Sequence, residues 1–246
     1  MTRAIEAQGL TRKFGSFTAV NDLTFYVEQG EVFGFLGANG AGKTTAIRML
    51  IGVLAPTEGS ASVAGFDLST RADAARRRIG YMSQKFSLYE DLTVWENIAL
   101  YGAIYGLTDS EIENRGLSLL EELELSHARD RLVATLPLGW KQKLAFSVAL
   151  VHRPAVVFLD EPTGGVDPIT RRQFWELIYG AAKRGTTVLV TTHYLEEAEY
   201  CDRVSIMVDG RIVAIGTPGE LKAEQGVASL DDVFVRLARA STVAAA

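Results

Sequence analysis

One glycine-rich run constrains this chain more than any other part of its sequence. Residues 37–44 read Gly-Ala-Asn-Gly-Ala-Gly-Lys-Thr and match the pattern G-x-x-x-x-G-K-[ST] at every fixed position. An apolar run at 32–36 precedes it, and a helical pattern with Ile47 and Leu50 on one face begins at Lys43. The order of strand, glycine-rich turn and helix predicts an α/β fold in which this turn surrounds a phosphate group.

Each residue type in this run suits the binding of a nucleotide. Glycines let backbone N–H groups curl around phosphate oxygens, and the amino end of the following helix adds its positive dipole. Lys43 is predicted to reach the β- and γ-phosphates, and the Thr44 hydroxyl to ligate Mg²⁺. The predicted nucleotide-binding residues of this segment are Gly37, Asn39, Gly40, Ala41, Gly42, Lys43, Thr44 and Thr45.

Two adjacent acidic residues end a second apolar run. Residues 155–159 are Ala-Val-Val-Phe-Leu, and Asp160 and Glu161 follow them directly. Open α/β sheets bind ligands at the carboxyl ends of their strands, so both carboxylates are expected beside the glycine-rich loop. Asp160 is predicted to hold Mg²⁺, often through water, and Glu161 to polarise a water molecule that attacks the γ-phosphate.

The remaining pattern favours a parallel sheet covered by helices. Three apolar runs have the length of strands that are buried on both faces, and a helical pattern at 168–183 separates the first two. The opening of the chain is β-rich, residues 93–151 are mostly helical in pattern, and Asp209-Gly210 is typical of a two-residue hairpin turn. Thr108 and Glu111 form a candidate capping box. The three apolar runs are residues 155–159, 186–191 and 204–208.

A stripe of apolar residues near the end of the chain predicts an amphipathic helix. Such a helix is expected to pack on its own domain, and a contact with a partner is the alternative. The residues of the stripe are Leu230, Val233, Phe234, Leu237 and Ala238.

Composition excludes several classes of protein. Of 246 residues, 48% are hydrophobic and 22% are charged, which is unlike disordered or collagen-like chains. The net charge of −5 lacks the basic character of nucleic-acid binders, so no nucleic acid is expected as a partner. Cys201 is the single cysteine, which excludes an intrachain disulfide, and it is expected to be a small buried hydrophobe.

No apolar stretch reaches the roughly 20 residues that span a bilayer, and no secretory signal is seen, so a cytoplasmic location is expected.

Further motifs, in this order, resemble the ATP-binding cassette (ABC) ATPases over nearly the whole chain. Gln84 stands where that family has its Q-loop glutamine, residues 164–167 (Gly-Gly-Val-Asp) resemble its D-loop, and His193 resembles its switch histidine. Phe14 stands where an aromatic residue stacks on adenine, and Asp167-Pro168 also has the form of a helix start. The resemblance implies ATP and Mg²⁺ as ligands. The implied catalytic residues are Glu161, His193 and Gln84, and the implied magnesium ligands are Thr44, Gln84 and Asp160.

The resemblance also implies a domain organisation. The expected fold is a P-loop NTPase core, a mostly parallel sheet flanked by helices, with an N-terminal antiparallel β subdomain and an inserted α-helical subdomain. Residues 1–246 are expected to form a single ABC ATPase domain. The core with its β subdomain is expected at about 1–84 and 152–222, the helical subdomain at about 85–151, and the C-terminal helix and tail at about 223–246.

The signature segment departs from the family pattern. Leu-Ser-Gly-Gly-Gln aligns here with residues 136–140, Leu-Pro-Leu-Gly-Trp, of which only Leu136 and Gly139 match. In the family this segment covers ATP held by the opposite subunit, and its serine hydroxyl binds the γ-phosphate; Pro137 has neither a hydroxyl nor an N–H group. Gly139 and Lys141 remain as candidate anion partners. Trp140 is expected either at the dimer seam or in the core.

The implied function is that of an ATPase subunit that dimerises around two MgATP and drives export by a separate integral membrane permease. Segments 136–142, 216–222 and 229–234 resemble bacterial multidrug or antibiotic export ATPases, and the chain is expected at the cytoplasmic face of the inner membrane. The permease is expected to dock near Phe86, Tyr89 and Trp95, which are equally expected in the core. The alternatives are a soluble ABC ATPase without a transporter and a nucleotide-gated module with little turnover. A homodimer, a heterodimer with a second ABC ATPase and a tandem fusion remain open.

Overall fold

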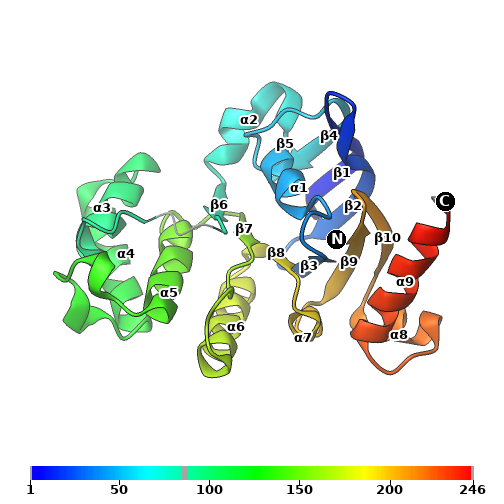
Figure 1. Ribbon diagram of the computed structural model, residues 1–246. Helices are drawn as coiled ribbons and strands as arrows, with labels where there is room; N and C mark the ends of the chain where they lie inside the picture. Colours follow the sequence, from blue (N-terminus) through cyan, green and yellow to red (C-terminus); the bar gives the residue numbers. More distant parts are fainter. Residues whose placement is uncertain (1, 85–87, 245–246) are drawn as a thin grey trace.

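The computed structural model describes residues 2–84 and 88–244, which form two sheets with helices packed around them (Figure 1). Within the described residues, the larger sheet has six strands in the order β10-β9-β3-β8-β7-β6. All neighbouring pairs in it are parallel except β9 and β10, which the Asp209-Gly210 turn joins as a hairpin. The expected mostly parallel sheet is thereby confirmed. The strands are β3 (Val32–Gly37), β6 (Ile79–Met82), β7 (Val156–Asp160), β8 (Thr187–Thr192), β9 (Arg203–Val208) and β10 (Arg211–Gly216).

A smaller antiparallel sheet is built from the amino-terminal part of the chain. Its order over the described residues is β2-β1-β4-β5, and every neighbouring pair is antiparallel. This arrangement confirms the expected N-terminal antiparallel β part. The pairing of β1 with β4 has no clear sequence signal, because the two strands are far apart in the chain. The strands are β1 (Arg3–Phe14), β2 (Phe17–Glu28), β4 (Glu58–Val63) and β5 (Phe66–Asp67).

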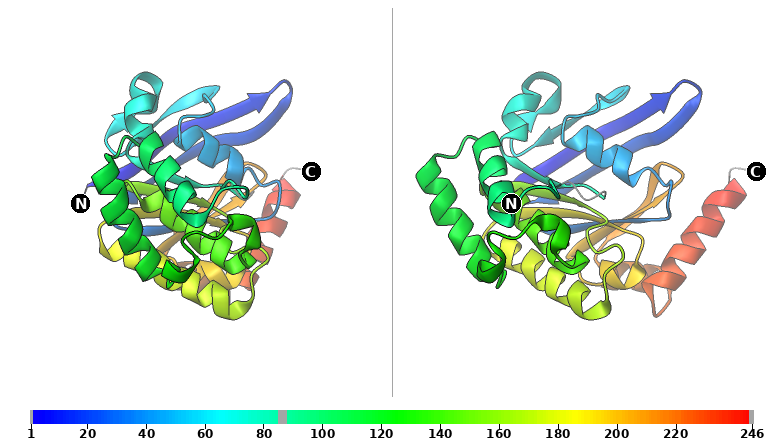
Figure 2. Two further views of the ribbon diagram at one scale, coloured as in Figure 1. Left: turned by 90° about the vertical axis from the view of Figure 1, so that its left-hand side faces the viewer. Right: turned by 60° about the vertical axis from the view of Figure 1, so that its left-hand side comes forward.

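Helices surround both sheets. Helices α3, α4 and α5 lie between β6 and β7 in the chain and gather at one end of the molecule, whereas α8 and α9 lie at the other end (Figures 1 and 2). The described helices are α1 (Lys43–Leu50), α2 (Leu68–Arg76), α3 (Val94–Ile104), α4 (Asp109–Glu122), α5 (Leu138–Leu150), α6 (Pro168–Lys183), α7 (Leu195–Ala198), α8 (Pro218–Gln225) and α9 (Leu230–Ala244), with 3₁₀ turns at Ser126–Ala128 and Val133–Thr135.

Local sequence explains where several helices begin. The Thr108 side chain accepts from the Glu111 N–H group and the Glu111 side chain accepts in return, so the expected capping box is formed. Asp167 caps α6, and Pro168 occupies its first turn, as the sequence predicts. These caps satisfy N–H groups that the first turn of a helix would otherwise leave without partners.

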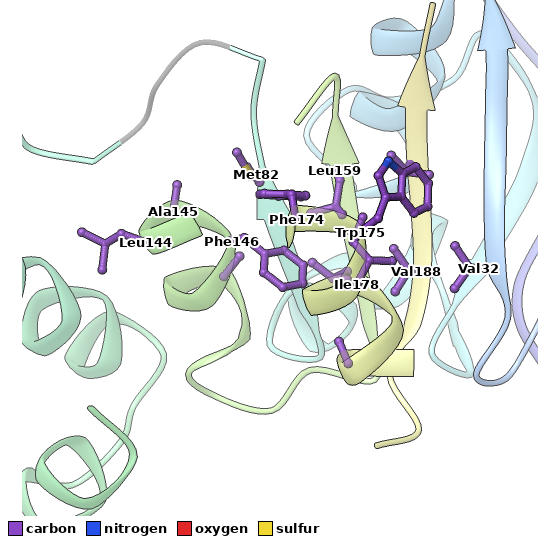
Figure 3. Packing of buried hydrophobic residues seen from close by; sticks show 14 of the residues in the cluster. Val32, Met82, Leu144, Ala145, Phe146, Leu159, Phe174, Trp175, Ile178 and Val188 are labelled. Atoms are coloured by element: carbon purple, nitrogen blue, oxygen red, sulfur yellow. The ribbon is translucent and has the colours of Figure 1, made fainter. Parts of the chain in front are cut away.

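The strands of the larger sheet divide their side chains between two hydrophobic cores. Along β7, Val157 and Leu159 face a core that includes α5, α6 and α9, whereas Val156 and Phe158 face a core shared with α1 and the antiparallel sheet. Figure 3 shows the first core around Phe174 and Trp175 of α6. Because alternate residues of a strand point to opposite faces, a strand buried on both faces needs a continuous apolar run.

The end of the chain and Cys201 fit the first of these cores. Leu230 and Val233 of α9 are buried in it, and Phe234 packs against it, which confirms that the amphipathic helix covers its own domain. Cys201 is buried there as expected, and burial raises the pKa of its thiol. Over residues 2–84 and 88–244, no helix is long and apolar enough to cross a membrane.

The aromatic residues predicted near the docking region have different environments. Phe86 lies outside the described residues. Tyr89 is exposed, whereas Trp95 packs against the first core with the Arg129 guanidinium carbon 4.2 Å from its ring centroid. Trp95 is therefore partly buried, with one part packed against the core, whereas Tyr89 is exposed on the surface.

His152 joins the end of α5 to the sheet. Its ring stacks on Tyr105 with centroids 3.6 Å apart, and its Nε2 lies 3.1 Å from the carbonyl oxygen of Ile79. Burial lowers the pKa of His152 to about 4, and the nearby Arg115 acts in the same direction. The ring is therefore neutral in the folded protein over the range in which an unfolded histidine takes up a proton.

We expect His152 to make the folded state less stable as the pH falls from about 6.5 toward 4, because the unfolded chain then binds a proton that the folded chain does not. The slope contributed is at most about 1.4 kcal/mol per pH unit. Urea unfolding of the wild type and of His152→Gln at pH 7.5 and pH 5 measures it. The variant should lose less stability between the two values, and the matched change at exposed His127, His127→Gln, should leave the loss unchanged; equal losses in all three proteins would contradict the assignment.

Candidate nucleotide site

The carboxyl ends of three neighbouring strands meet at one edge of the larger sheet. Strand β3 pairs with β8, and β8 pairs with β7, all in parallel, with Asp160 opposite Thr191 and Leu36 opposite Thr192. The segments that leave these strands are the glycine-rich loop, the loop that begins with Glu161, and the turn that carries His193. Parallel pairing thus brings the glycine-rich loop together with two segments that lie more than 100 residues after it in the chain.

The glycine-rich loop depends on glycine for its conformation. Gly40 has a φ of 84° and Gly42 a φ of 101°, values that other residues rarely adopt. A Cβ atom on Gly42 would also lie 2.5 Å from the carbonyl oxygen of Ala19, so β2 passes too close for any side chain. The loop leads directly into α1, whose first N–H groups and dipole suit an anion.

Lys43 reaches back over this loop. Its Nζ donates to the carbonyl oxygens of Gly37 at 2.7 Å and Ala38 at 3.0 Å, and it lies 3.5 Å from Oε1 of Glu161. The side chain is almost fully buried, and burial lowers the pKa of its ammonium group, with Glu161 acting in the opposite direction. The ammonium group therefore links the loop after β3 to the loop after β7.

The Glu161 carboxylate is the point at which the predicted catalytic residues meet. The Gln84 amide nitrogen donates to Oε2 at 3.1 Å, and Nδ1 of His193 lies 3.1 Å from the same oxygen. Glu161 itself has a φ of 50°, an uncommon value for a residue with a side chain. Glu161, Gln84 and His193 come together as the sequence predicts, with Lys43 on the other carboxylate oxygen.

Asp160 has the environment of a cation ligand. It is 1% exposed, and its Oδ1 accepts from the hydroxyls of Thr44 at 3.2 Å and Thr191 at 2.7 Å. Its Oδ2 is buried and has no hydrogen-bond partner among the described residues. A buried carboxylate oxygen without a donor, beside a threonine hydroxyl, suits Mg²⁺, which prefers oxygen ligands.

The protein by itself supplies few metal ligands here. Within residues 2–84 and 88–244, no group of three or more histidine, cysteine or acidic side chains could hold a metal ion. Magnesium sites with only one or two protein ligands are completed by substrate phosphates and water. Gln84, also predicted as a magnesium ligand, points its amide nitrogen at Glu161 in this structure.

Thr191 belongs to this site although the sequence did not single it out. Its hydroxyl accepts from the Glu161 N–H group at 2.9 Å and donates to Oδ1 of Asp160. It therefore holds both acidic residues at the end of β7 from the neighbouring strand. The sequence signal that could have indicated Thr191 is its place in an apolar run, where a strand is expected to be buried. The structure shows that Thr191 is fully buried, and a buried hydroxyl needs a hydrogen-bond partner.

The signature segment lies apart from this cluster within one chain. Pro137 is the residue before the first turn of α5, without a side-chain cap, and Figure 1 shows α5 well separated from α1. A Cβ on Gly139 would lie 2.6 Å from Cγ2 of Thr170, so this glycine allows α5 to approach α6. Within one chain, the first turn of α5 therefore does not meet the first turn of α1.

The neighbours of Gly139 contact the same chain. The Trp140 ring is partly buried against the first core and lies edge-on to His127 at 5.3 Å between centroids. Lys141 forms an ion pair with Glu90, its Nζ 2.5 Å from Oε1. The Gln142 amide donates to the carbonyl oxygen of Gly164 at 2.9 Å, a link between α5 and the predicted D-loop that the sequence did not indicate.

Phe14, the predicted adenine contact, lies at the end of β1. Its ring is 47% exposed, and the Arg12 guanidinium carbon lies 4.6 Å from its centroid. Phe17, opposite it on β2, is also exposed. The hairpin of β1 and β2 therefore exposes two aromatic side chains, one of which contacts Arg12.

Comparison with known proteins agrees with this geometry. The family model described as ABC transporter matches residues 20–164. The chain is 46% identical over 243 residues to the probable multidrug ABC transporter ATP-binding protein YbhF of Escherichia coli strain K12, covering 95% of this chain and 41% of that protein. It thus spans less than half of the length of that relative.

Two solved structures have the same fold. One, described as the ATP-binding subunit of an ABC transporter, has a TM-score of 0.86, 34% identity, and coverage of 95% of this chain and 99% of that chain. Another, a dimeric post-hydrolysis state of an ATP-binding cassette bound to ADP and Pi, has a TM-score of 0.78, 25% identity, and coverage of 87% and 98%. With the family model covering more than half of its residues, the chain belongs to the ABC transporter family as an ATP-binding domain.

Proposed function

We propose that the chain binds MgATP and hydrolyses it as a dimerising subunit that powers export through a separate membrane-spanning partner. The observation that carries the proposal is the gathering of Lys43, Gln84 and His193 around the Glu161 carboxylate, next to the Thr44–Asp160 pair. A base, a cation and a magnesium ligand at the end of a glycine-rich loop are parts that phosphoryl transfer to water uses.

Each side chain has a role in this proposal. The N–H groups of the glycine-rich loop and the Lys43 ammonium group hold the phosphates. In the structure this ammonium group donates to the carbonyl oxygens of Gly37 and Ala38, so bound phosphates compete with these two carbonyls for it. Thr44 and Asp160 hold Mg²⁺, which supplies neutralising charge for the phosphate oxygens when bound. Glu161 accepts a proton from the attacking water, and His193 and Gln84 keep its carboxylate in place. The Phe14 ring stacks on adenine.

Two partners are proposed for this chain, a second ABC ATPase domain and a membrane permease. Within one chain, the first turn of α5 lies away from the Lys43 cluster, so it is available to cover a nucleotide held by a second ABC ATPase domain, identical or different. The dimeric solved relative supports this arrangement. The relative named as multidrug suggests drug-like or antibiotic export, with the chain at the cytoplasmic face of the membrane and the helical part near residues 85–151 meeting the permease.

We expect Glu161→Gln to lower Mg²⁺-dependent ATP hydrolysis by more than about a hundredfold while it keeps ATP binding, because the amide cannot take the proton. Lys43→Ala removes a charge-assisted contact, so ATP should bind about tenfold to a hundredfold more weakly. Phosphate release over a protein concentration series and equilibrium binding of a fluorescent ATP analogue measure the two effects. The exposed Lys183→Ala change, in the last turn of α6, is the matched control and should leave both unchanged.

Three outcomes would revise the proposal. Hydrolysis that persists in Glu161→Gln would remove Glu161 from its role. Tight ATP binding without any turnover, alone and with a copurified membrane partner, would favour a nucleotide-gated module instead. Cosedimentation with ribosomes and no membrane partner would favour a soluble ABC ATPase.

We expect Pro137→Ser to raise both turnover and thermal stability. A serine at the residue before α5 can cap its first turn, which is worth about 1 kcal/mol, and it restores a hydroxyl at the position where the family binds the γ-phosphate. Pro137→Ala is the matched control, because it removes the ring without adding a hydroxyl. Turnover and melting temperature of the three proteins test this, and equal turnover in Pro137→Ser and Pro137→Ala would show that the hydroxyl has no part.

A further inference from the structure

A carboxyl group lies fully buried beneath the turn that carries His193. Glu197 belongs to the short helix α7 and is 0% exposed, whereas its neighbour Glu196 on the same helix is exposed. Removing a carboxyl group from water is unfavourable unless hydrogen bonds and a cation replace the water. The partners of Glu197 therefore reveal why this position holds an acid.

Those partners come from three different elements. The Thr163 hydroxyl donates to Oε1, and the Thr192 hydroxyl donates to Oε2 at 2.7 Å. Nε of Arg171, on α6, lies 3.3 Å from Oε1. Thr163 lies in the loop that follows β7, and Thr192 is the last residue of β8. One carboxyl group thus contacts the loop after β7, the end of β8 and the helix between them.

Each of the two threonines is close in sequence to a predicted catalytic residue. Thr163 follows Glu161 by two residues, and Thr192 immediately precedes His193. The Thr192 hydroxyl also accepts from the Tyr194 N–H group at 2.9 Å, so this hydrogen bond joins the two residues that flank His193.

Arg171, which pairs with Glu197, also contacts the residue that follows His193. Its guanidinium carbon lies 4.4 Å from the ring centroid of Tyr194, whose own ring centroid is 4.2 Å from that of His193. The cation that pairs with Glu197 therefore also supports the ring against which His193 packs. The chain of contacts runs from Glu197 through Arg171 and Tyr194 to His193.

We infer that Glu197 is a positioning residue that holds the loop of Glu161 and the turn of His193 in register; this inference rests on the proposed hydrolysis of MgATP. The 3.1 Å separation between His193 Nδ1 and Glu161 Oε2 joins two loops that leave different strands. The shared carboxyl of Glu197 ties those loops together below the site. Glu197 does not touch the nucleotide-binding loop, so its effect falls on turnover and not on ATP binding.

Glu197→Gln, with Glu196→Gln as the matched control, tests this inference. The glutamine amide keeps the size of the side chain but lacks the charge that pairs with Arg171. Its NH₂ group is a donor where the carboxylate oxygen now accepts from the Thr192 hydroxyl. We expect kcat to fall about tenfold to a hundredfold, since small displacements of reacting groups have effects of that size. KM for ATP and affinity for a fluorescent ATP analogue should change less than about threefold. Glu196→Gln should behave as the wild type.

A double-variant cycle and amide hydrogen exchange separate positioning from general stability. Thr192→Val should lower kcat to a similar extent, and Thr192→Val with Glu197→Gln should add little further loss, because both changes break one contact. Hydrogen exchange in Glu197→Gln should rise at residues 161–167 and 191–194 together, and Glu196→Gln should show no rise. Should Glu197→Gln fail to fold, Thr192→Val and Thr163→Val carry the same measurements.

Two results would overturn the inference. One is turnover by Glu197→Gln equal to that of Glu196→Gln, and the other is exchange at the two segments that stays at the wild-type level. If the wild type itself hydrolyses no ATP, the proposed function fails, and the exchange measurement still decides the positioning role.

Discussion

The parallel pairing of β3, β8 and β7 is the constraint on which the rest of this structure depends. Each of these strands is buried on both faces, so each must be apolar along its whole length, and its polar residues collect at the ends. Because the strands run in one direction, their carboxyl ends share one edge of the sheet, which brings Gly37, Asp160 and Thr192 together.

Polar groups that reach this edge are partly buried and must find partners there. Lys43 meets Glu161, Thr191 holds Asp160, and Glu197 gathers Thr163 and Thr192 beneath them. In each case the partner comes from a different strand or loop, so hydrogen bonding and loop position depend on each other. One oxygen, Oδ2 of Asp160, is left without a partner among the described residues, at the place where a cation is expected.

Sequence patterns anticipated much of the fold and of the site, for identifiable reasons. The glycine-rich run and the apolar strand ending in Asp160-Glu161 are local signals, and helix caps such as Thr108 and Asp167 act over three or four residues. Contacts between distant segments left weaker signals. Thr191, Glu197 and Gln142 acquire their partners only after strands and helices pack, and nothing in their immediate neighbours indicates those partners.

The sequence by itself determined the chemical groups available and the local turns that present them: the glycine-rich loop, the two acids after a buried strand, and a proline at position 137. The tertiary structure decided which of these groups meet. It placed Gln84 and His193 on one carboxylate oxygen, packed one side of Trp140 against the first core, and kept α5 apart from α1. The physical reason is that backbone propensity and capping act over a few residues, whereas strand order and the packing of helices on a sheet bring together residues that are far apart in the chain.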